Sequence, residues 1–259
     1  MNALFSFVLF FFSFLLYTHD TTYIIIHGTW AQSQEWYQEG GDFFDTLYSL
    51  TDDSDTIISF SWSGSCFESA RIVAAQQLAL LFESIKTEKL ICIGHSHGGN
   101  VALKAAEFLQ RYALSRTIDI LILLGTPHYH DFYFPKPVLF IFNFFSFGDQ
   151  IQPIFNLFKR DIPDTSQSVN VSLMIEGREP DHEQLHHPLI AFHISDIIQM
   201  GLCLRESIGQ TPLALHIEYG QPAQYKEDIH RNERIAADII FQQYLPSYLL
   251  STESLYFFL

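Results

Sequence analysis

The chain has 259 residues, which is enough for one large domain with a sizeable hydrophobic core. Only 17% of its residues are charged and its formal net charge is −15, so its surface is acidic. That balance argues against nucleic acid as a partner and against electrostatic attraction to anionic membranes. The three cysteines match no metal-binding spacing and leave the redox compartment open.

Residues 1–20 form an apolar N-terminal segment. The run from Leu4 to Tyr17 is too short to span a bilayer comfortably, but it has the length of a signal-peptide core. No Lys or Arg precedes it, since the first basic residue of the chain is Arg71, and no Ala-X-Ala cleavage site follows it. We therefore keep two interpretations: a signal or anchor, through which the protein would contact a membrane, and an element of the core. The localisation, exported or membrane-associated against cytoplasmic, stays open.

Residues 21–201 alternate between short apolar runs and helical patterns. The apolar runs are Thr22–Ile26, Thr56–Trp62, Leu90–Ile93, Ile118–Leu124, Val138–Phe145 and Val169–Ile175. Amphipathic patterns predict helices over Phe67–Ile85, Asn100–Tyr112 and Pro188–Met200. This alternation predicts an α/β domain with a mostly parallel sheet covered by helices on both faces. In such sheets the site lies beyond the carboxyl ends of the strands.

Residues 202–259 form a C-terminal extension that matches no motif. A charged, amphipathic pattern predicts a helix over Gln224–Tyr244, packed at the edge of the same domain.

The most informative stretch is Gly94-His95-Ser96-His97-Gly98, which lies between an apolar run and a helical pattern. A bare Gly-X-Ser-X-Gly is a weak signal, but the order strand, motif, helix is that of a nucleophile elbow. It places the serine at the tip of a sharp turn, and the glycines leave room where a Cβ atom would clash. The helix N-terminus that follows favours negative charge near the serine.

Four motifs together resemble the serine lipase/esterase branch of the α/β-hydrolase superfamily, over roughly Tyr23 to Met200. They are Ile24–Trp30, Phe60–Gly64, Gly94–Gly99 and Leu123–Pro127. The resemblance implies the α/β-hydrolase fold and cleavage of a small-molecule or lipid acyl ester through an acyl-enzyme, with no cofactor and no metal. It leaves the acyl chain, the head group and the oligomeric state undetermined.

The resemblance also implies a nucleophile, an acid and a base in the order Ser, Asp or Glu, His. Ser96 is the expected nucleophile. Asp149, directly after the run that ends at Phe145, is the preferred acid, and Asp131 is the alternative.

The base is expected in the loop after the last predicted strand, where histidines are crowded. His182 lies closest to the strand end and is preferred, and His186 is the second candidate. His193 is expected inside the following helix, as a core or surface residue.

The oxyanion hole is expected to use backbone N–H groups. One comes from His97, which follows the nucleophile, and the other from Thr29 or Trp30. His27 and Gly28 are expected to shape that loop. The segment His128–Phe158 is rich in Phe and Tyr and is interpreted either as an acyl pocket or lid, or as ordinary core.

Two rival functions remain. His182-Glu183-X-X-His186 also spells the His-Glu-X-X-His pattern of zinc proteases, although Pro188 would end a helix directly after it. A hydrolase fold can also serve as a non-catalytic binding scaffold.

Overall fold

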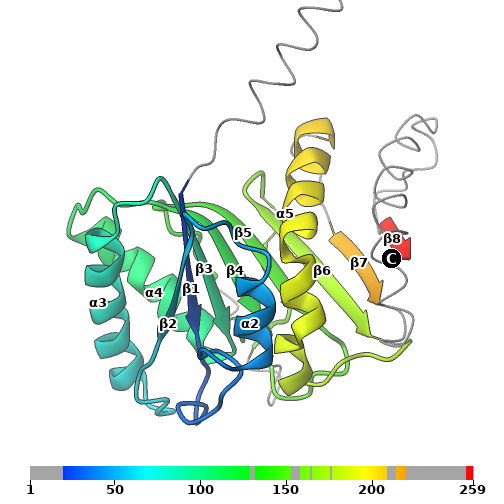
Figure 1. Cartoon of the computed structure of the whole chain (residues 1–259), viewed down its shortest axis with the longest axis horizontal. Helices are drawn as coiled ribbons and strands as arrows, with labels where there is room; N and C mark the ends of the chain where they lie inside the picture. The colour runs from blue at the N-terminus through cyan, green and yellow to red at the C-terminus, as the bar shows by residue number, and fades with distance from the viewer. Residues whose placement is uncertain are drawn as a thin grey trace, which may run out of the picture.

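The centre of the protein is a parallel sheet. The computed structural model describes residues 20–128, 132–152, 158–163, 165–175, 177–208, 214–219 and 255–258. Within these residues the sheet has eight strands in the order β2-β1-β3-β4-β5-β6-β7-β8, and every neighbouring pair is parallel (Figure 1). This arrangement, a parallel sheet with helices on both faces, is the α/β architecture that the sequence predicted.

The strands are β1 (Thr21–Ile26), β2 (Thr56–Phe60), β3 (Lys89–His95), β4 (Ile118–Leu124), β5 (Val138–Phe145), β6 (Ser168–Ile175), β7 (Ala214–Tyr219) and β8 (Leu255–Phe258). The helices are α2 (Asp42–Tyr48), α3 (Glu68–Ser84), α4 (His97–Arg111) and α5 (Pro188–Ile208), with a short 3-10 helix, η2 (Glu183–His186).

All six predicted strands are present in this sheet, and each of the three helices predicted within residues 21–201 has a counterpart. Three features differ from the expectation. The helix α2 was not predicted, α5 continues to Ile208, and the C-terminal extension adds β7 and β8 to the sheet edge. The expected helix Gln224–Tyr244 and the apolar segment 1–20, except Asp20, lie outside the described residues. No helix among the described residues is long and apolar enough to cross a membrane.

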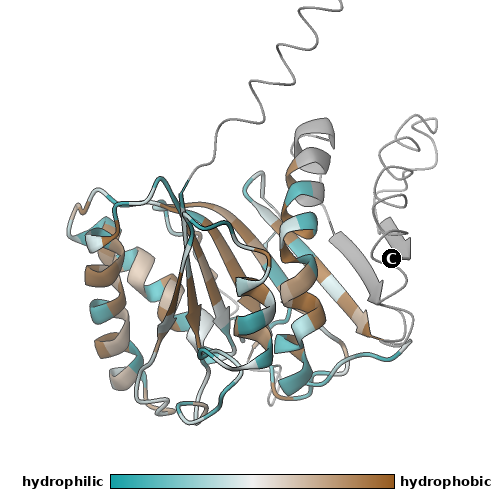
Figure 2. Cartoon of the chain, in the orientation of Figure 1, coloured by the Kyte–Doolittle hydropathy of each residue, from teal (hydrophilic) through white to brown (hydrophobic). Residues whose placement is uncertain are grey.

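Strand side chains alternate between two hydrophobic cores, one on each face of the sheet. In β3, Leu90 and Cys92 face the core built with α3 and α4. Ile91 and Ile93 face the opposite core, built with α2 and α5. Figure 2 shows β1, β3, β4 and β5 as largely hydrophobic, as expected for strands buried on both faces.

The order in which the strands are connected produces a switch point between β1 and β3. From β1 the chain moves outward to β2, and it then crosses back to form β3 on the other side of β1. Such a reversal leaves a crevice outside the carboxyl ends of the two strands at the switch point, where ligands of α/β proteins bind. The residues after β1 begin at His27, and the residue after β3 is Ser96.

Gly94 allows α4 to start close against β3. A Cβ atom on Gly94 would lie 2.6 Å from both the Cα and the backbone nitrogen of Gly99. Both contacts are with backbone, so the clash can be relieved only by moving the first turn of α4.

We therefore predict that Gly94→Ala lowers the free energy of unfolding by about 2 kcal/mol or more, as overpacking in a rigid core does. Chemical denaturation measures this. Gln76→Ala, on the exposed side of α3, is the matched control and should change stability by less than about 0.5 kcal/mol. Equal stability of the two variants would contradict this account of the elbow.

Candidate active site

Ser96 is held in a strained turn between β3 and α4. Its backbone has φ 52° and ψ −132°, a conformation that residues other than glycine rarely adopt. Its N–H donates to the carbonyl oxygen of Leu124 at 2.8 Å, which ties the turn to the end of β4. Strain of this kind persists only where surrounding structure enforces it, and it is concentrated at functional sites.

The loop after β1 lies directly against this serine. A Cβ atom on Gly28 would lie 2.8 Å from the Cβ and 3.4 Å from the Oγ of Ser96. The structure therefore brings the loop after β1 and the turn after β3 together at the switch point.

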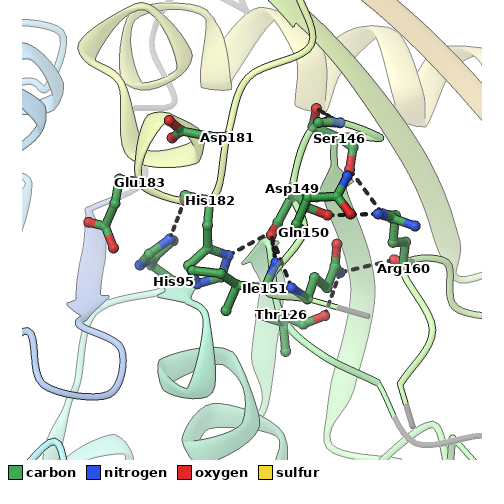
Figure 3. A network of polar contacts seen from close by, with 12 residues as sticks. His95, Thr126, Ser146, Asp149, Gln150, Ile151, Arg160, Asp181, His182 and Glu183 are labelled. Atoms are coloured by element: carbon green, nitrogen blue, oxygen red, sulfur yellow. Dashed lines mark hydrogen bonds and ion pairs between the residues drawn. The ribbon is translucent and has the colours of Figure 1, made fainter. Parts of the chain in front are cut away.

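Asp149 and His182 form a buried acid–imidazole pair. The Oδ2 atom of Asp149 lies 2.7 Å from Nδ1 of His182, and both side chains are almost fully buried (Figure 3). Oδ1 of the same carboxylate accepts the N–H groups of Ile151 at 2.8 Å and Gln152 at 3.0 Å. An ionised carboxylate only accepts hydrogen bonds, so His182 carries its proton on Nδ1 and leaves Nε2 free to take another.

The end of β4 links this pair to Ser96. Leu124 binds the Ser96 N–H, and the next residue, Gly125, backs the pair. A Cβ atom on Gly125 would lie 3.2 Å from Asp149 Oδ2 and 3.3 Å from His182 Nδ1. Ser96 and His182 form no hydrogen bond with one another in the part of the chain that the structure describes. In unliganded enzymes such contacts are often long and tighten only when substrate binds.

The backbone donors expected for an oxyanion hole differ in their availability. His97 is the first residue of α4, and N–H groups in a first helical turn have no partner within the helix. The Trp30 N–H, in contrast, donates to the carbonyl oxygen of Gly64 at 2.8 Å. Trp30 is thus the weaker of the two candidates after β1, and Thr29 is the donor that remains.

His27 cross-links the loops after β1 and β2. Its side chain is fully buried, with Nδ1 2.8 Å from the Gly28 carbonyl oxygen. Its Nε2 accepts the backbone N–H of Trp62 at 3.1 Å, and the Trp62 indole N–H returns a hydrogen bond to the His27 carbonyl oxygen at 2.8 Å. Burial lowers the pKa of His27, and the hydrogen bonds of its ring and carbonyl oxygen hold the loop that carries Gly28.

The other two histidines that follow His182 and were weighed in the sequence, His186 and His193, lie away from Asp149. His186 stacks on Trp36, with ring centroids 4.3 Å apart, and does not contact Asp149. His193 lies inside α5, as expected. The alternative acid, Asp131, lies outside the described residues, as do parts of the aromatic segment that was interpreted as a pocket, a lid or core.

The zinc pattern is not arranged for a metal. Glu183–His186 is a 3-10 turn rather than an α-helix, and His182 is directed to Asp149 while His186 stacks on Trp36. Among the described residues no group of three or more His, Cys, Asp or Glu side chains could hold a metal ion.

Arg160, which the sequence did not single out, holds the loop that carries Asp149. It donates to the carbonyl oxygen of Ser146 at 3.1 Å from Nε and to that of Asp149 at 2.7 Å from Nη2 (Figure 3). Gln152 donates to the Thr126 carbonyl oxygen at 2.7 Å, joining this loop to the end of β4. These contacts end on backbone oxygens, which every residue has, so no sequence signal marks them.

A second buried network supports the same region from β5. The Nε2 atom of His128 donates to Asn143 Oδ1 at 2.8 Å, and Asn143 Nδ2 donates to Asn170 Oδ1 at 2.9 Å. Asn143 Nδ2 also lies 2.7 Å from the Arg160 carbonyl oxygen. Burial lowers the pKa of His128 from 6.5 to about 4, so this network contains a neutral imidazole at neutral pH.

No protein-family model and no curated protein matches this sequence. Among solved structures it is similar to ClbQ from the colibactin NRPS/PKS pathway, with a TM-score of 0.45 and 11% identity over 73% of this chain and 100% of that chain. It is also similar to an arylesterase (TM-score 0.40, 12% identity, 73% and 77% of the two chains). A third is the type II thioesterase BorB from the borrelidin cluster (TM-score 0.37, 10% identity, 86% and 91%). All three scores are below 0.5, so conclusions on function rest on this chain's own residues.

His128 makes the stability of the fold depend on pH. The unfolded chain binds a proton on this residue below pH 6.5, and the folded chain only below about 4, so between these values the unfolded state holds more protons. Stability from this group is complete above pH 6.5 and is lost as the pH falls towards 4.

We predict that His128 alone accounts for a loss of up to about 3 kcal/mol over this window, at about 1.4 kcal/mol per pKa unit. The free energy of unfolding, measured by denaturation between pH 7 and pH 4, should fall less steeply in His128→Gln than in the native sequence. Parallel curves for the two proteins would show that His128 does not titrate in this way.

Proposed function

We propose that this protein is a serine hydrolase that cleaves carboxylic esters through an acyl-enzyme, with Ser96 as nucleophile, His182 as general base and Asp149 as the acid that orients it. The observation that carries the proposal is the buried 2.7 Å contact between Asp149 and His182, one strand end away from a strained serine. A structural ion pair alone gives no reason for the strained serine beside it.

The chemistry follows from the tautomer of His182. Its free Nε2 takes the proton from the Ser96 hydroxyl as Oγ attacks the ester carbonyl carbon. The imidazolium that forms is stabilised by Asp149, and it then protonates the leaving alcohol as the bond from carbon to the alcohol oxygen breaks. Water then attacks the acyl-enzyme, with His182 taking its proton and passing it to the Ser96 oxygen. This step releases the carboxylic acid product and restores Ser96.

The negative charge that develops on the carbonyl oxygen needs donors that are already in place. We assign these to the backbone N–H groups of His97 and Thr29. The position of the first at the N-terminus of α4 adds the favourable helix dipole.

Two rivals are separated from this proposal by one reagent. A fluorophosphonate probe labels an activated serine, whereas a zinc protease or an inert scaffold is not labelled. Labelling of the native chain that disappears in Ser96→Ala supports the proposal, and an unlabelled native chain counts against it.

We predict that Ser96→Ala and His182→Ala each lower kcat for p-nitrophenyl ester hydrolysis by about 10³-fold or more, and that the double variant is little worse, because nucleophile and base act as a unit. Asp149→Asn should also be severe, since it favours the wrong imidazole tautomer. Initial rates at saturating substrate measure these effects.

Glu183→Gln is the matched control, because Glu183 neighbours the base but contacts neither Asp149 nor Ser96. It should leave kcat/KM within about twofold of the native value. An inactive Glu183→Gln with an active Ser96→Ala would instead favour zinc chemistry, and activity that is lost on chelation and restored by zinc would agree with that.

We further propose that the substrate is apolar next to the scissile bond, because Trp30 offers it an apolar surface. The Trp30 side chain is 81% exposed although its backbone is held at φ 59°, and its N–H is fixed by Gly64. Phe67, at the start of α3, is 71% exposed. An exposed tryptophan held in a strained backbone two residues from Gly28 fits a contact with substrate better than a core role.

Trp30→Ala is predicted to lower kcat/KM for an octanoate ester by about 10-fold or more and to change it little for an acetate ester, because the lost contact is apolar area. Tyr48→Ala, which removes a 66% exposed aromatic ring at the far end of α2, is the control. The ratio of the two rates should change in Trp30→Ala only. An unchanged ratio in both variants would show that Trp30 does not contact the acyl chain.

A further inference from the structure

His95, which directly precedes the nucleophile, has a contact that the proposed mechanism does not use. We propose that His95 is a positioning residue, which holds the loop carrying His182 against the elbow so that the base faces Ser96. This inference rests on the proposed function, in which His182 is the base.

The contact is one buried hydrogen bond. Nε2 of His95 lies 2.9 Å from the backbone carbonyl oxygen of His182 (Figure 3). A carbonyl oxygen only accepts, so His95 is the tautomer with its proton on Nε2. Its Nδ1 is buried and has no hydrogen-bond partner among the described residues, so this bond is the one polar contact of the ring. His95 is 2% exposed, and its single hydrogen bond is made to the backbone of the proposed base, His182.

This bond spans the fold. His95 and His182 are 87 residues apart, and in the sheet the strands β4 and β5 lie between β3 and β6. Asp149 holds the His182 ring at Nδ1, and His95 holds the same residue at its backbone. One attachment holds the backbone of His182 and the other holds its ring. Together they fix both the position of the residue and the direction of its side chain, which a single attachment does not.

Ring packing strengthens the same attachment. The centroid of the His95 ring lies 4.7 Å from that of His182 and 4.8 Å from that of His186. The Trp36 ring, from the loop after β1, packs edge-to-face with the His95 ring, with centroids 5.6 Å apart, and it stacks on His186. The loop that carries His182 is therefore packed on His95 at the end of β3 and on Trp36 from the loop after β1.

His95 is also suited to this place by its charge. Burial, followed by the proximity of His182 and His186, holds the pKa of His95 well below its ordinary value. A neutral ring therefore lies beside His182 when that residue becomes an imidazolium during the reaction. A permanent cation at this position would oppose the charge that the mechanism needs.

The test compares two neutral replacements. His95→Gln keeps an N–H donor at about the distance of Nε2, whereas His95→Phe keeps the ring and removes the donor. We expect His95→Phe to lower kcat by about 10- to 100-fold with KM within twofold of the native value, because misplacing a catalytic group by a fraction of an ångström lowers the rate without changing ground-state binding. His95→Gln should recover most of kcat.

A second readout does not depend on turnover. The proton in the hydrogen bond between His182 and Asp149 gives a far-downfield proton resonance, which should be sharp in the native protein and in His95→Gln and broadened or lost in His95→Phe. Thermal denaturation identifies which variants are folded, and His95→Met replaces His95→Phe if the latter does not fold.

The outcomes separate the two proposals. Full activity in Ser96→Ala and His182→Ala would overturn the proposed function. If those variants are inactive while a folded His95→Phe keeps the native kcat and the native resonance, the positioning role is wrong. Equal loss of kcat in the Gln and Phe variants would also reject it, because the N–H donor would then make no difference.

Discussion

The buried carboxylate of Asp149 is the constraint on which the rest of the site depends. A fully buried charge costs several kcal/mol unless donors surround it, and here the donors are the His182 ring and the backbone N–H groups of Ile151 and Gln152. These donors come from two loops, after β5 and after β6, so both loops must close on the same point. Satisfying the charge and aligning the imidazole are thus one structural requirement. Removing His182 would leave the carboxylate with an empty acceptor in the interior.

The parallel sheet makes this closure possible. All strands end at the same edge, so the residues that follow β1, β3, β4, β5 and β6 converge there although they are spread over more than half of the sequence. The end of β4 lies between the other two elements, with Leu124 holding the elbow and Gly125 backing the acid–imidazole pair. The polar side chains behind them, Arg160 and Asn143 among them, bind backbone carbonyls of this edge rather than solvent.

The sequence predicted the fold well where burial leaves a local pattern. The strands β1, β3, β4 and β5 are apolar runs ended by turns, because these strands are covered on both faces. The strand β7 alternates apolar and polar residues in Ala-Leu-His-Ile-Glu-Tyr, and β8 has only four residues, so neither resembles a buried strand. Of the candidate site, residue order alone placed Asp149 and His182 after neighbouring strands. The contacts of His95, Arg160 and the Trp30 N–H with backbone oxygens could not be predicted, since a carbonyl acceptor carries no residue identity.

The main groups of the candidate site are each held by more than one attachment. Asp149 has three donors, His182 is attached at its ring and its backbone, and the Ser96 backbone is locked by its turn and by Leu124. Under the proposed mechanism these attachments hold the base in place before a substrate binds, so little of the binding energy is needed to assemble the site. In the proposed mechanism, the attachments of Asp149 and His182, which lie away from the serine, therefore set the position of the base relative to Ser96.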